Sequence, residues 1–543
     1  MSQQTDRHVS VTHINWQRVF DFTLLFRAFR LAINPAKITL ALLAVMLIYA
    51  AGCLFDLVWG PQVYADEIMS YQSLNTKAYQ RLREIRNQDR SRGIENLLIQ
   101  IADPASKNSP RAAYHAIKAA HIRQFQQKIE SLDQEARQSA AKRLHADIKH
   151  AQSVVGTGIF DAFITRQTTL FQSLIHNTFT FFRIVQTQPQ GFDTKVSGPT
   201  VATSLLPRDA ETLTQSYSIT GSLYNMAVTT PMWLVSATAP MQYRPENADT
   251  FGGWVKMIVY RGLYLASLLL LTLFSITLLA FTGASISRLS ALELADIERV
   301  PLLEVFRFAA CRLWTFIKAI LTPFLIILVV GLLITALSLV GAVPYIGEII
   351  LGVFFIALLL IAFVVMLLTL GIIGGINLLF PTIAVEGSDA FDAMSRSFAY
   401  IYARPWRLLF YSLISLAYGA VTYLFVSFAT YLIFLITHTF VGWGIFFAQG
   451  RLSGSSKFDT LWPFPKFGQA ADINWYAMNW SEFIGATFLH FWLSIFIFAI
   501  IGYVISYYFS VHTIIYLLLR RSVDGQSTTE VFQEPTPKPA PTT

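Results

Sequence analysis

The stretch AILTPFLIILVVGLLITALSLVGAVPYIGEIILGVFFIALLLIAFVVMLLTLGIIGGINLLF, residues 319–380, holds one charged side chain, Glu348. The apolar core of a bilayer is about 30 Å thick, and a helix of roughly 20 apolar residues crosses it. Each central Leu, Ile, Phe or Val favours insertion by about 0.3–0.6 kcal/mol, whereas a central charge costs about 3 kcal/mol. The stretch is long enough for two such helices, joined at residues 343–347. It therefore predicts a multi-pass membrane protein.

Apolar runs elsewhere in the chain predict further spans. Of the 543 residues, 54% are hydrophobic and only 14% are charged, whereas soluble domains have about 25% charged residues. We expect an all-α integral membrane protein with six transmembrane helices and a helical extracytoplasmic domain inserted between spans one and two. The predicted spans cover residues 38–59, 255–283, 319–342, 349–375, 408–437 and 483–517.

Composition divides the chain into five parts. They are a cytosolic N-terminal segment with an interfacial helix (1–37), transmembrane helix 1 (38–59), the helical extracytoplasmic domain (60–253), a five-helix membrane domain with cytosolic amphipathic helices (254–519) and a disordered cytosolic tail (520–543).

Two stretches of the extracytoplasmic domain, residues 72–100 and 111–153, are predicted to be helical. In the second stretch a stripe recurs at every third or fourth residue, which is typical of a helix with one buried face. The stripe consists of Tyr114, Ile117, His121, Phe125, Ile129, Leu132, Ala136, Ala140, Leu144 and Ile148.

Basic residues predict the orientation in the membrane. Because cytoplasmic loops are enriched in Lys and Arg, we expect both termini in the cytoplasm and residues 60–253 outside. The turn at residues 343–348 has no basic residue, as an outer loop should. The expected location is the cell membrane, as a bacterial inner membrane protein. The basic residues on the cytoplasmic side include Arg27, Arg30, Lys37, Arg288, Arg299, Arg307, Arg312, Lys318, Arg396, Arg404, Arg407, Arg520 and Arg521.

Sequence motifs for chemistry are missing. The chain has no phosphate loop, no dinucleotide-binding glycine pattern, no His-Glu-x-x-His zinc motif and no Gly-x-Ser-x-Gly elbow. No charged residue lies at mid-depth in the predicted spans, where ion-coupled proteins need one. His490 and His512 are predicted to be isolated, hydrogen-bonded packing residues. We therefore expect no enzyme, no catalytic or metal-binding residue, no cofactor and no nucleic-acid partner, and we attribute the net charge of +8 to membrane orientation.

The two cysteines, Cys53 and Cys311, predict no disulfide framework. The segment Ala50-Ala51-Gly52-Cys53 resembles a lipoprotein cleavage box. It lies far from the start and more apolar residues follow it, which favours a retained anchor. Lipidation of Cys53 stays open as the alternative.

An amphipathic segment precedes three of the spans, at residues 20–30, 301–314 and 388–398. Each segment has an acidic residue early and Arg later, the order that the helix dipole favours. We expect these helices to lie flat at the cytosolic headgroups with Phe and Leu dipping in. Either they only anchor and orient the bundle, or they form a lipid-sensing or partner-docking surface. Pro35 and Pro405 are predicted to mark the turn into the span, and Ser388 is predicted as an N-cap.

The third segment contains a motif that extends beyond it. Residues 380–390 read FPTIAVEGSDA, and an Arg-Pro-Trp follows at residues 404–406. Together with Val523-Asp524-Gly525, this pattern resembles an uncharacterised bacterial multi-pass membrane protein family, over roughly residues 255–530. More loosely it is similar to membrane domains associated with glycerophosphodiester phosphodiesterases. The resemblance implies a topology and no activity. The predicted interfacial motif consists of Glu386, Ser388, Asp389 and Arg396.

Small and hydroxylated residues recur on the later spans. Gly371 and Gly375 have the spacing that lets helices pack closely, and they also suit a bend. Hydroxyl groups at helical spacing either join helices by hydrogen bonds or line a polar pathway, and the first is the commoner case. The polar stripe consists of Ser412, Ser415, Thr422, Thr430, Ser506 and Ser510.

These features favour a non-enzymatic scaffold or assembly factor that displays the helical domain outside. The alternative is a transporter or lipid-handling permease for a neutral or lipidic substrate, with the hydroxyl stripe as its route. The expected partners are the lipid bilayer and a protein bound through residues 60–253, and a homo-oligomer stays open. A cavity lined by Ser412, Thr422 and Ser506 would favour the transporter, and a closed bundle the scaffold.

Overall fold

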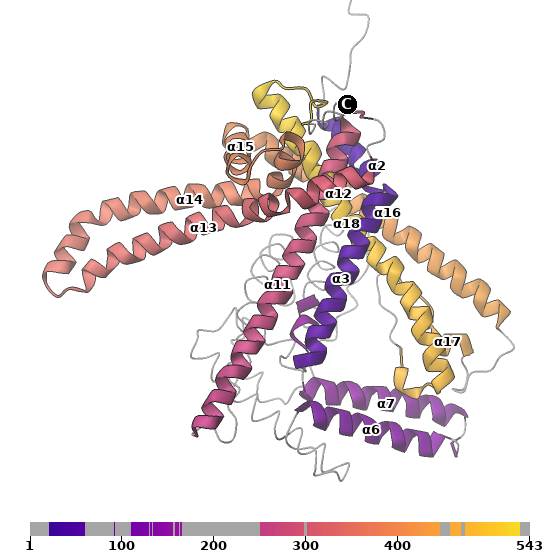
Figure 1. The fold of residues 1–543 in the computed structure, drawn as a ribbon. Coiled ribbons are helices and arrows are strands. Elements are labelled where there is room, and N and C mark those ends of the chain that lie inside the picture. The colour runs from indigo at the N-terminus through magenta and orange to yellow at the C-terminus, as the bar shows by residue number, and fades with distance from the viewer. Residues whose placement is uncertain are drawn as a thin grey trace, which may run out of the picture. The chain divides into compact units, whose positions relative to one another are not determined.

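The computed structural model describes residues 21–59, 92, 110–129, 131–132, 134–155, 158–161, 163–164, 250–297, 301–445, 457–467 and 473–532. These residues are almost entirely helical and contain no strand. Within them, six helices are long and apolar enough to cross a membrane, which is consistent with a multi-pass membrane protein (Figure 1). They are α3 (Pro35–Trp59), α11 (Phe251–Leu294), α13 (Leu313–Ser338, continued by the 3₁₀ turn η5, Leu339–Ala342), α14 (Ile346–Glu386), α16 (Pro405–Gly444) and α18 (Trp480–Asp524).

The six helices fall where the sequence predicted spans, but most are longer. The fourth span was predicted to cover residues 349–375, whereas α14 continues through Pro381 to Glu386. Gly387 ends it in the left-handed conformation (φ +66°), which glycine adopts at little cost. Helix α14 therefore continues beyond its apolar run and ends only at Gly387.

The amphipathic segments form short helices before three of the long ones. They are η1 (Asp21–Arg27) with α2 (Ala28–Ala32), α12 (Leu302–Cys311) and α15 (Ala390–Ala403). Pro35 and Pro405 are the first residues of α3 and α16, as predicted for the turn into the span. Proline suits this position because its missing N–H would have no helical partner there.

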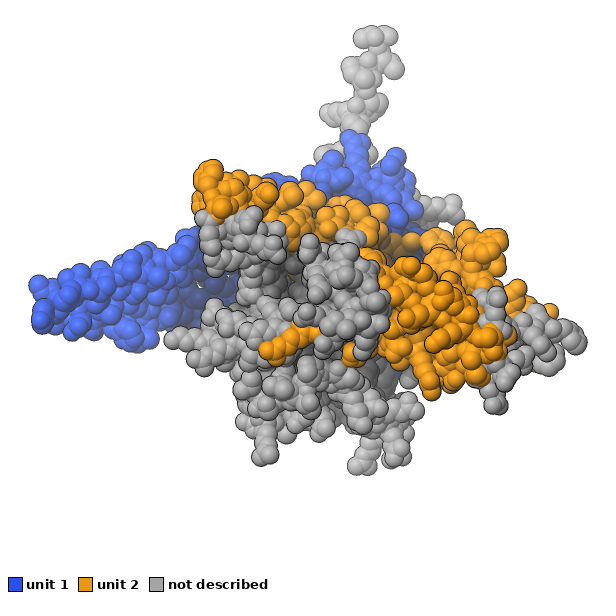
Figure 2. All heavy atoms as spheres, turned by 90° about the horizontal axis from the view of Figure 1, so that it is seen from below, with its two compact units in different colours: residues 1–45, 275–425, 497–543 blue, residues 46–274, 426–496 orange. Residues whose placement is uncertain are grey.

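The chain forms two compact units (Figure 2). Unit 1 comprises residues 1–45, 275–425 and 497–543, and unit 2 comprises residues 46–274 and 426–496. The boundary passes through α3, α11, α16 and α18, so each of these helices contributes to both units.

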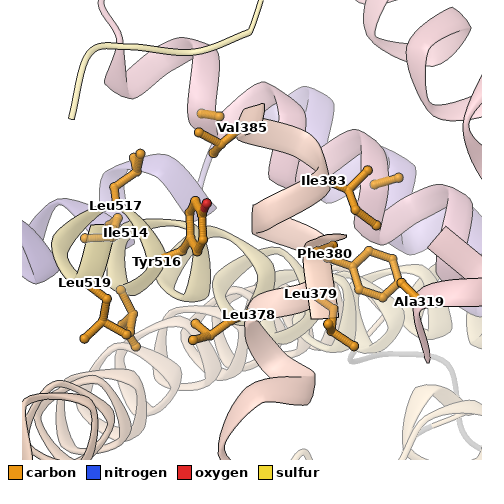
Figure 3. Packing of buried hydrophobic residues seen from close by; sticks show 14 of the residues in the cluster. Ala319, Leu378, Leu379, Phe380, Ile383, Val385, Ile514, Tyr516, Leu517 and Leu519 are labelled. Atoms are coloured by element: carbon orange, nitrogen blue, oxygen red, sulfur yellow. The ribbon is translucent and has the colours of Figure 1, made fainter. Parts of the chain in front are cut away.

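The hydrophobic core of unit 1 lies at the ends of the long helices (Figure 3). It gathers the last turns of α14 around Leu379 and Ile383 and the last turns of α18 around Ile514 and Leu517. The short helices add their apolar faces, for example Phe308 of α12 and Phe398 of α15, which are 4% and 8% exposed. The prediction that Phe and Leu of these helices dip into lipid is therefore wrong for the residues in this core. Phe391 and Leu303 of the same helices do remain exposed.

Helices α13 and α14 lie side by side as a hairpin whose outer surface is bare (Figure 1). No residue in the most apolar window of either helix is buried within the structure. The turn between them holds Tyr345 in the left-handed region (φ +67°), and this residue is 85% exposed. In unit 1 the hairpin is packed at its α15 end and open along the rest of its length.

In unit 2 the predicted helix over residues 111–153 is two helices, so the prediction of one continuous helix is wrong. Helix α6 (Pro110–Ile129) and helix α7 (Gln134–Val155) pack against each other. No Gly or Pro marks the break. The Ser131 hydroxyl donates to Lys128 O at 2.8 Å, a local bond of the kind that competes with helix continuation.

The predicted stripe is the seam of this hairpin. Ile117, Phe125, Ile129, Leu144 and Ile148 are all buried. The 3₁₀ turn η6 (Trp475–Ala477) packs against this seam through Tyr476 and Ala477. The short helix α17 (Lys457–Leu461) comes before η6 in the chain. The predicted helix at residues 72–100 (Arg92 apart) and the tail from residue 533 lie outside the described residues.

We predict that Gly387→Ala destabilises the protein more than Gly525→Ala. Both glycines have positive φ, +66° and +70°, so each alanine costs about 1 kcal/mol in backbone strain. A Cβ at Gly387 would also lie 2.6 Å from the Phe532 ring, whereas a Cβ at Gly525 would meet no atom within 4 Å. Thermal unfolding in detergent micelles measures the difference, and equal shifts would show that Phe532 does not rest on Gly387.

Candidate functional site at the end of α14

The last carbonyls of α14 find their hydrogen-bond donors in other segments of unit 1. The final four C=O groups of a helix have no partner within it. In α14, one of these C=O groups accepts a hydrogen bond from the terminal glycine, and two accept from residues that are distant in sequence. The bonds are Gly387 N to Ile383 O at 2.8 Å, Arg288 Nη1 to Ala384 O at 2.8 Å, and Phe532 N to Val385 O at 2.7 Å.

Two arginines complete this helix end. Arg288 of α11 also donates to Phe532 O at 2.6 Å, and Arg312, which follows α12, donates to Gly387 O. The Arg312 guanidinium lies 5.3 Å from the centre of the Phe532 ring. Positive charge is favourable at a helix C-terminus, where the helix dipole is negative. The end of α14 is thus held by α11, by α12 and by the segment after α18.

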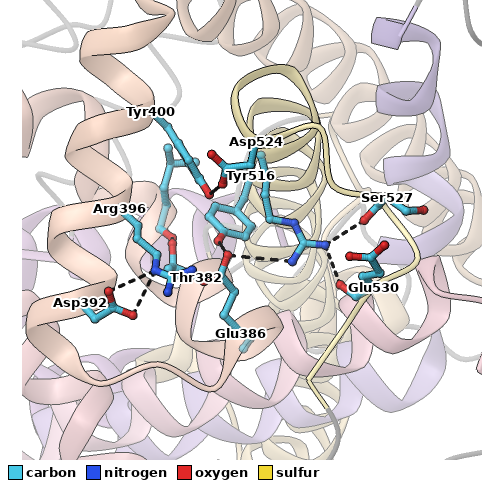
Figure 4. Close-up of polar contacts among 12 residues, drawn as sticks. Thr382, Glu386, Asp392, Arg396, Tyr400, Tyr516, Asp524, Ser527 and Glu530 are labelled. Carbon is cyan, nitrogen blue, oxygen red and sulfur yellow. Dashed lines mark hydrogen bonds and ion pairs between the residues drawn. The ribbon is translucent and has the colours of Figure 1, made fainter.

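Glu386 is the centre of a polar cluster beside this helix end (Figure 4). Its carboxylate accepts hydrogen bonds from the Tyr516 hydroxyl of α18 and from Arg396 of α15. Arg520 Nη1 lies 3.9 Å away. The Glu386 side chain is only 10% exposed, and a buried carboxylate needs such donors to offset its lost hydration.

Arg520 fastens the segment that follows α18. Its Nη2 donates to Ser527 O at 2.9 Å and to Glu530 O at 2.6 Å. The side chain is 3% exposed. Beside it, the Tyr400 hydroxyl of α15 donates to Asp524. Burial, and then this hydrogen bond, raise the pKa of Tyr400, so the phenol stays a proton donor at neutral pH.

The predicted interfacial motif lies at this cluster, with one correction. The N-cap of α15 is Asp389, whose side chain accepts from Asp392 N at 2.8 Å. The prediction of Ser388 as N-cap is wrong, because Asp389 is one residue closer to the helix. Arg396 is bound by Asp392 at 3.0 Å and by Glu386. The hydrogen bond that Arg396 donates to Asp392, followed by the charge of Glu386, raises the pKa of Arg396.

A hollow of about 430 Å³ opens beside the cluster. It is wide at its mouth, and charged and polar side chains from α14, α15 and the segment after α18 form most of its wall. Its lining consists of Val385, Glu386, Ser388, Asp392, Arg396, Arg520, Gln526, Glu530, Val531 and Phe532.

Five of the six hydroxyls of the predicted polar stripe make hydrogen bonds within the protein. Ser506 donates to Ala32 O at 2.8 Å, and Ser510 lies 3.0 Å from the hydroxyl of Ser290. Three hydroxyls on α16 bond back to their own helix, and Ser412 of the same helix is half-buried. Those bonds are Ser415 to Tyr411 O, Thr422 to Tyr418 O and Thr430 to Val426 O.

The two predicted packing glycines face α15. A Cβ at Gly371 would lie 2.9 Å from the Phe398 ring, and a Cβ at Gly375 would lie 2.7 Å from Ile401. Their close contact is therefore with the amphipathic helix that precedes α16.

The histidines of the long helices bond to backbone carbonyls. His512 Nδ1 lies 2.7 Å from Tyr508 O, and His490 Nε2 lies 3.3 Å from Leu461 O. These distances confirm the prediction of hydrogen-bonded packing residues. His438, which sequence reasoning did not single out, similarly meets Trp462 O at 3.1 Å. In the described part of the chain, no three His, Cys, Asp or Glu side chains come together as a metal site.

Several residues of the site carried too little sequence signal to be found. Arg288, Arg312, Arg520 and Lys37 were counted only as charges that set the orientation. Lys37 is in fact fully buried and pairs with Glu293 of α11 at 2.8 Å. A charge close to either end of a long apolar run is the one signal that such a residue has a buried partner.

Comparison with family models, with curated proteins and with solved structures finds no match to this chain. The resemblance noted for residues 255–530 therefore stays a prediction.

We predict that Glu386→Gln lowers the free energy of unfolding by about 3 kcal/mol. The substitution keeps the shape but removes the charge that faces the buried Arg520. Glu348→Gln is the control, because this residue of the same helix is exposed and should change stability by less than about 0.5 kcal/mol. Chemical denaturation in micelles measures both, and a neutral Glu386→Gln would contradict a central role for this carboxylate.

Proposed function

We propose that the chain is a non-enzymatic membrane scaffold or assembly factor. In this proposal the six long helices cross the bacterial inner membrane, both termini lie in the cytoplasm, and residues 60–253 form a domain outside. The lipid bilayer and at least one membrane protein are its partners.

The observation that carries the proposal is the use of the hydroxyl stripe. A transport route between α16 and α18 would need Thr422 and Ser506 to face open space. Thr422 is 6% exposed and Ser506 is fully buried. A Cβ at Gly419 would lie 2.7 Å from the Tyr507 ring, so the two helices touch there. This closed packing supports the scaffold over the permease.

The α13–α14 hairpin supports assembly with another membrane protein. Gly331 and Gly352 lie on its bare surface, and a Cβ at either would meet nothing within 4 Å. Interfaces between membrane helices are enriched in such small residues, because they let two backbones approach closely. A second copy of this chain is one candidate for the companion.

The external domain offers a different surface. The apolar stripe of α6 and α7 is buried in the contact between these two helices. A protein partner of this domain must therefore bind the faces of α6 and α7 that point away from that contact. Those faces are polar and basic, which suits a partner with an acidic surface. Their exposed basic residues include Arg123, Lys128, Lys142 and Arg143.

The topology proposal predicts opposite labelling at two sites. In a Cys53→Ser background, the exposed Cys311 of α12 should react with a membrane-impermeant maleimide only in inverted vesicles. In the same background with Cys311→Ser, Tyr345→Cys at the 85% exposed turn should react in intact spheroplasts. The reverse pattern would invert the orientation, and labelling of both from one side would contradict a spanning hairpin.

The assembly proposal predicts a stoichiometric companion in mild detergent, seen as a fixed complex mass. Gly331→Leu and Gly352→Leu should each reduce its recovery at least tenfold. A Cβ at either position would meet no atom within 4 Å, so we expect the yield and melting of the protomer to be unchanged. Leu332→Ile, at an exposed neighbour on α13, is the control. Recovery of monomer alone from the unaltered protein counts against the scaffold.

A further inference from the structure

The hollow at the end of α14 contains two hydrogen-bond donors that the chain leaves unused. Arg520 Nε and Ser388 Oγ are both buried, and neither has a hydrogen-bond partner among the described residues. Both residues line the hollow. A buried donor without a partner costs free energy, so two of them among the residues that line one hollow point to an acceptor that is bound from outside.

Arg520 is held in place for such a role. Its side chain is 3% exposed, and its Nη2 is fixed by two carbonyl bonds to Ser527 and Glu530. Glu386 lies on its Nη1 side at 3.9 Å. The guanidinium is therefore held in one orientation, and its Nε lies buried in a residue that lines the hollow. A fixed guanidinium edge beside a hydroxyl is a good receptor for a phosphate oxygen.

The charges of the lining disfavour a plain anion. Two guanidinium groups, on Arg396 and Arg520, face three carboxylates, on Glu386, Asp392 and Glu530. The Asp392 side chain is 43% exposed and Glu530 is exposed, and their oxygens can accept further hydrogen bonds. A ligand with a single negative group would be repelled by this surplus, whereas a ligand that also carries an ammonium group would be matched.

We propose that this hollow binds a small zwitterion with a phosphate group and a primary ammonium group. The phosphate accepts from Arg520 Nε and Ser388 Oγ, and the ammonium donates to Asp392 or Glu530. A volume of about 430 Å³ lies within the usual range of small-molecule sites, roughly 300–1,000 Å³. The chemistry is that of an ethanolamine phosphate, either as a lipid headgroup or as a soluble compound. The proposal does not depend on the scaffold function.

The first experiment titrates the full-length protein, purified and delipidated in maltoside, with O-phosphoethanolamine. Binding is measured by calorimetry and by the rise in melting temperature. Inorganic phosphate and ethanolamine should each bind at least tenfold more weakly, since each meets only half of the site. Phosphocholine should also bind more weakly, because its trimethylammonium group cannot donate a hydrogen bond. Equal affinity for inorganic phosphate would overturn the proposal.

The second experiment uses a variant that removes an unused donor. Ser388→Ala should weaken O-phosphoethanolamine binding about tenfold, which is the contribution of one hydrogen bond to a charged group. Without ligand it should melt at the same temperature or higher, because it loses no partner. Ser287→Ala is the matched control: its hydroxyl oxygen is likewise buried with no partner among the described residues, but the residue lies outside the hollow. Equal binding by Ser388→Ala and the unaltered protein would refute the assignment.

A third arm separates the two sources of the ligand. Nanodiscs with phosphatidylethanolamine and phosphatidylglycerol are compared with nanodiscs of phosphatidylglycerol alone. If the ligand is a lipid, native mass spectrometry should find phosphatidylethanolamine retained, less so in Ser388→Ala, and it should block O-phosphoethanolamine. If the ligand is soluble, O-phosphoethanolamine should bind equally in both discs. If neither phosphatidylethanolamine nor O-phosphoethanolamine binds, the proposal is overturned.

Discussion

The carbonyl groups at the C-terminal end of α14 must find donors, and much of unit 1 is arranged to supply them. Arg288 comes from α11, Arg312 follows α12, and Phe532 N comes from the segment beyond α18. Each donor ties a different part of the chain to the same helix end. A buried helix end without such partners would cost several kcal/mol. One requirement of the backbone thus fixes how four segments meet.

The buried residues of unit 1 gather at this end of the long helices, and the reason is the difference between lipid and water as surroundings. If the long helices lie in a bilayer, their apolar surfaces gain little by leaving lipid for protein, because lipid chains are as apolar as leucine. The α13–α14 hairpin accordingly buries none of its most apolar windows. Where the helices leave the apolar layer, burial again becomes favourable. The faces of α12 and α15 are used there, and Gly371 and Gly375 let α15 approach α14 closely.

The sequence was sufficient for the helices and insufficient for the site. Apolar runs located all six long helices, since insertion depends mainly on local composition. Pro35 and Pro405 located the turns into two of them, because proline constrains its own position. The break between α6 and α7 was missed, because a serine hydroxyl rather than a Gly or Pro accompanies it. Arg288 and Arg520 were missed as well, since each bonds to backbone carbonyls, which leave no trace in side-chain patterns. Only Glu386, Asp389 and Arg396, close together in sequence, formed a recognisable motif.

The closure of α14 also explains why a hollow lies beside it. Phe532 N and the Nη2 group of Arg520 hold residues 527–532 against the helix end, so this segment stands as one wall. Glu386 and α15 form the other wall, and hydrogen bonds to backbone carbonyls hold the first wall in place. Side chains on such walls cannot relax to satisfy one another, which is how Arg520 Nε and Ser388 Oγ come to be unpaired. A freely packed interface would have given these buried donors partners within the chain, whereas walls fixed by the needs of a helix end leave them without one, and the proposed ligand would supply it.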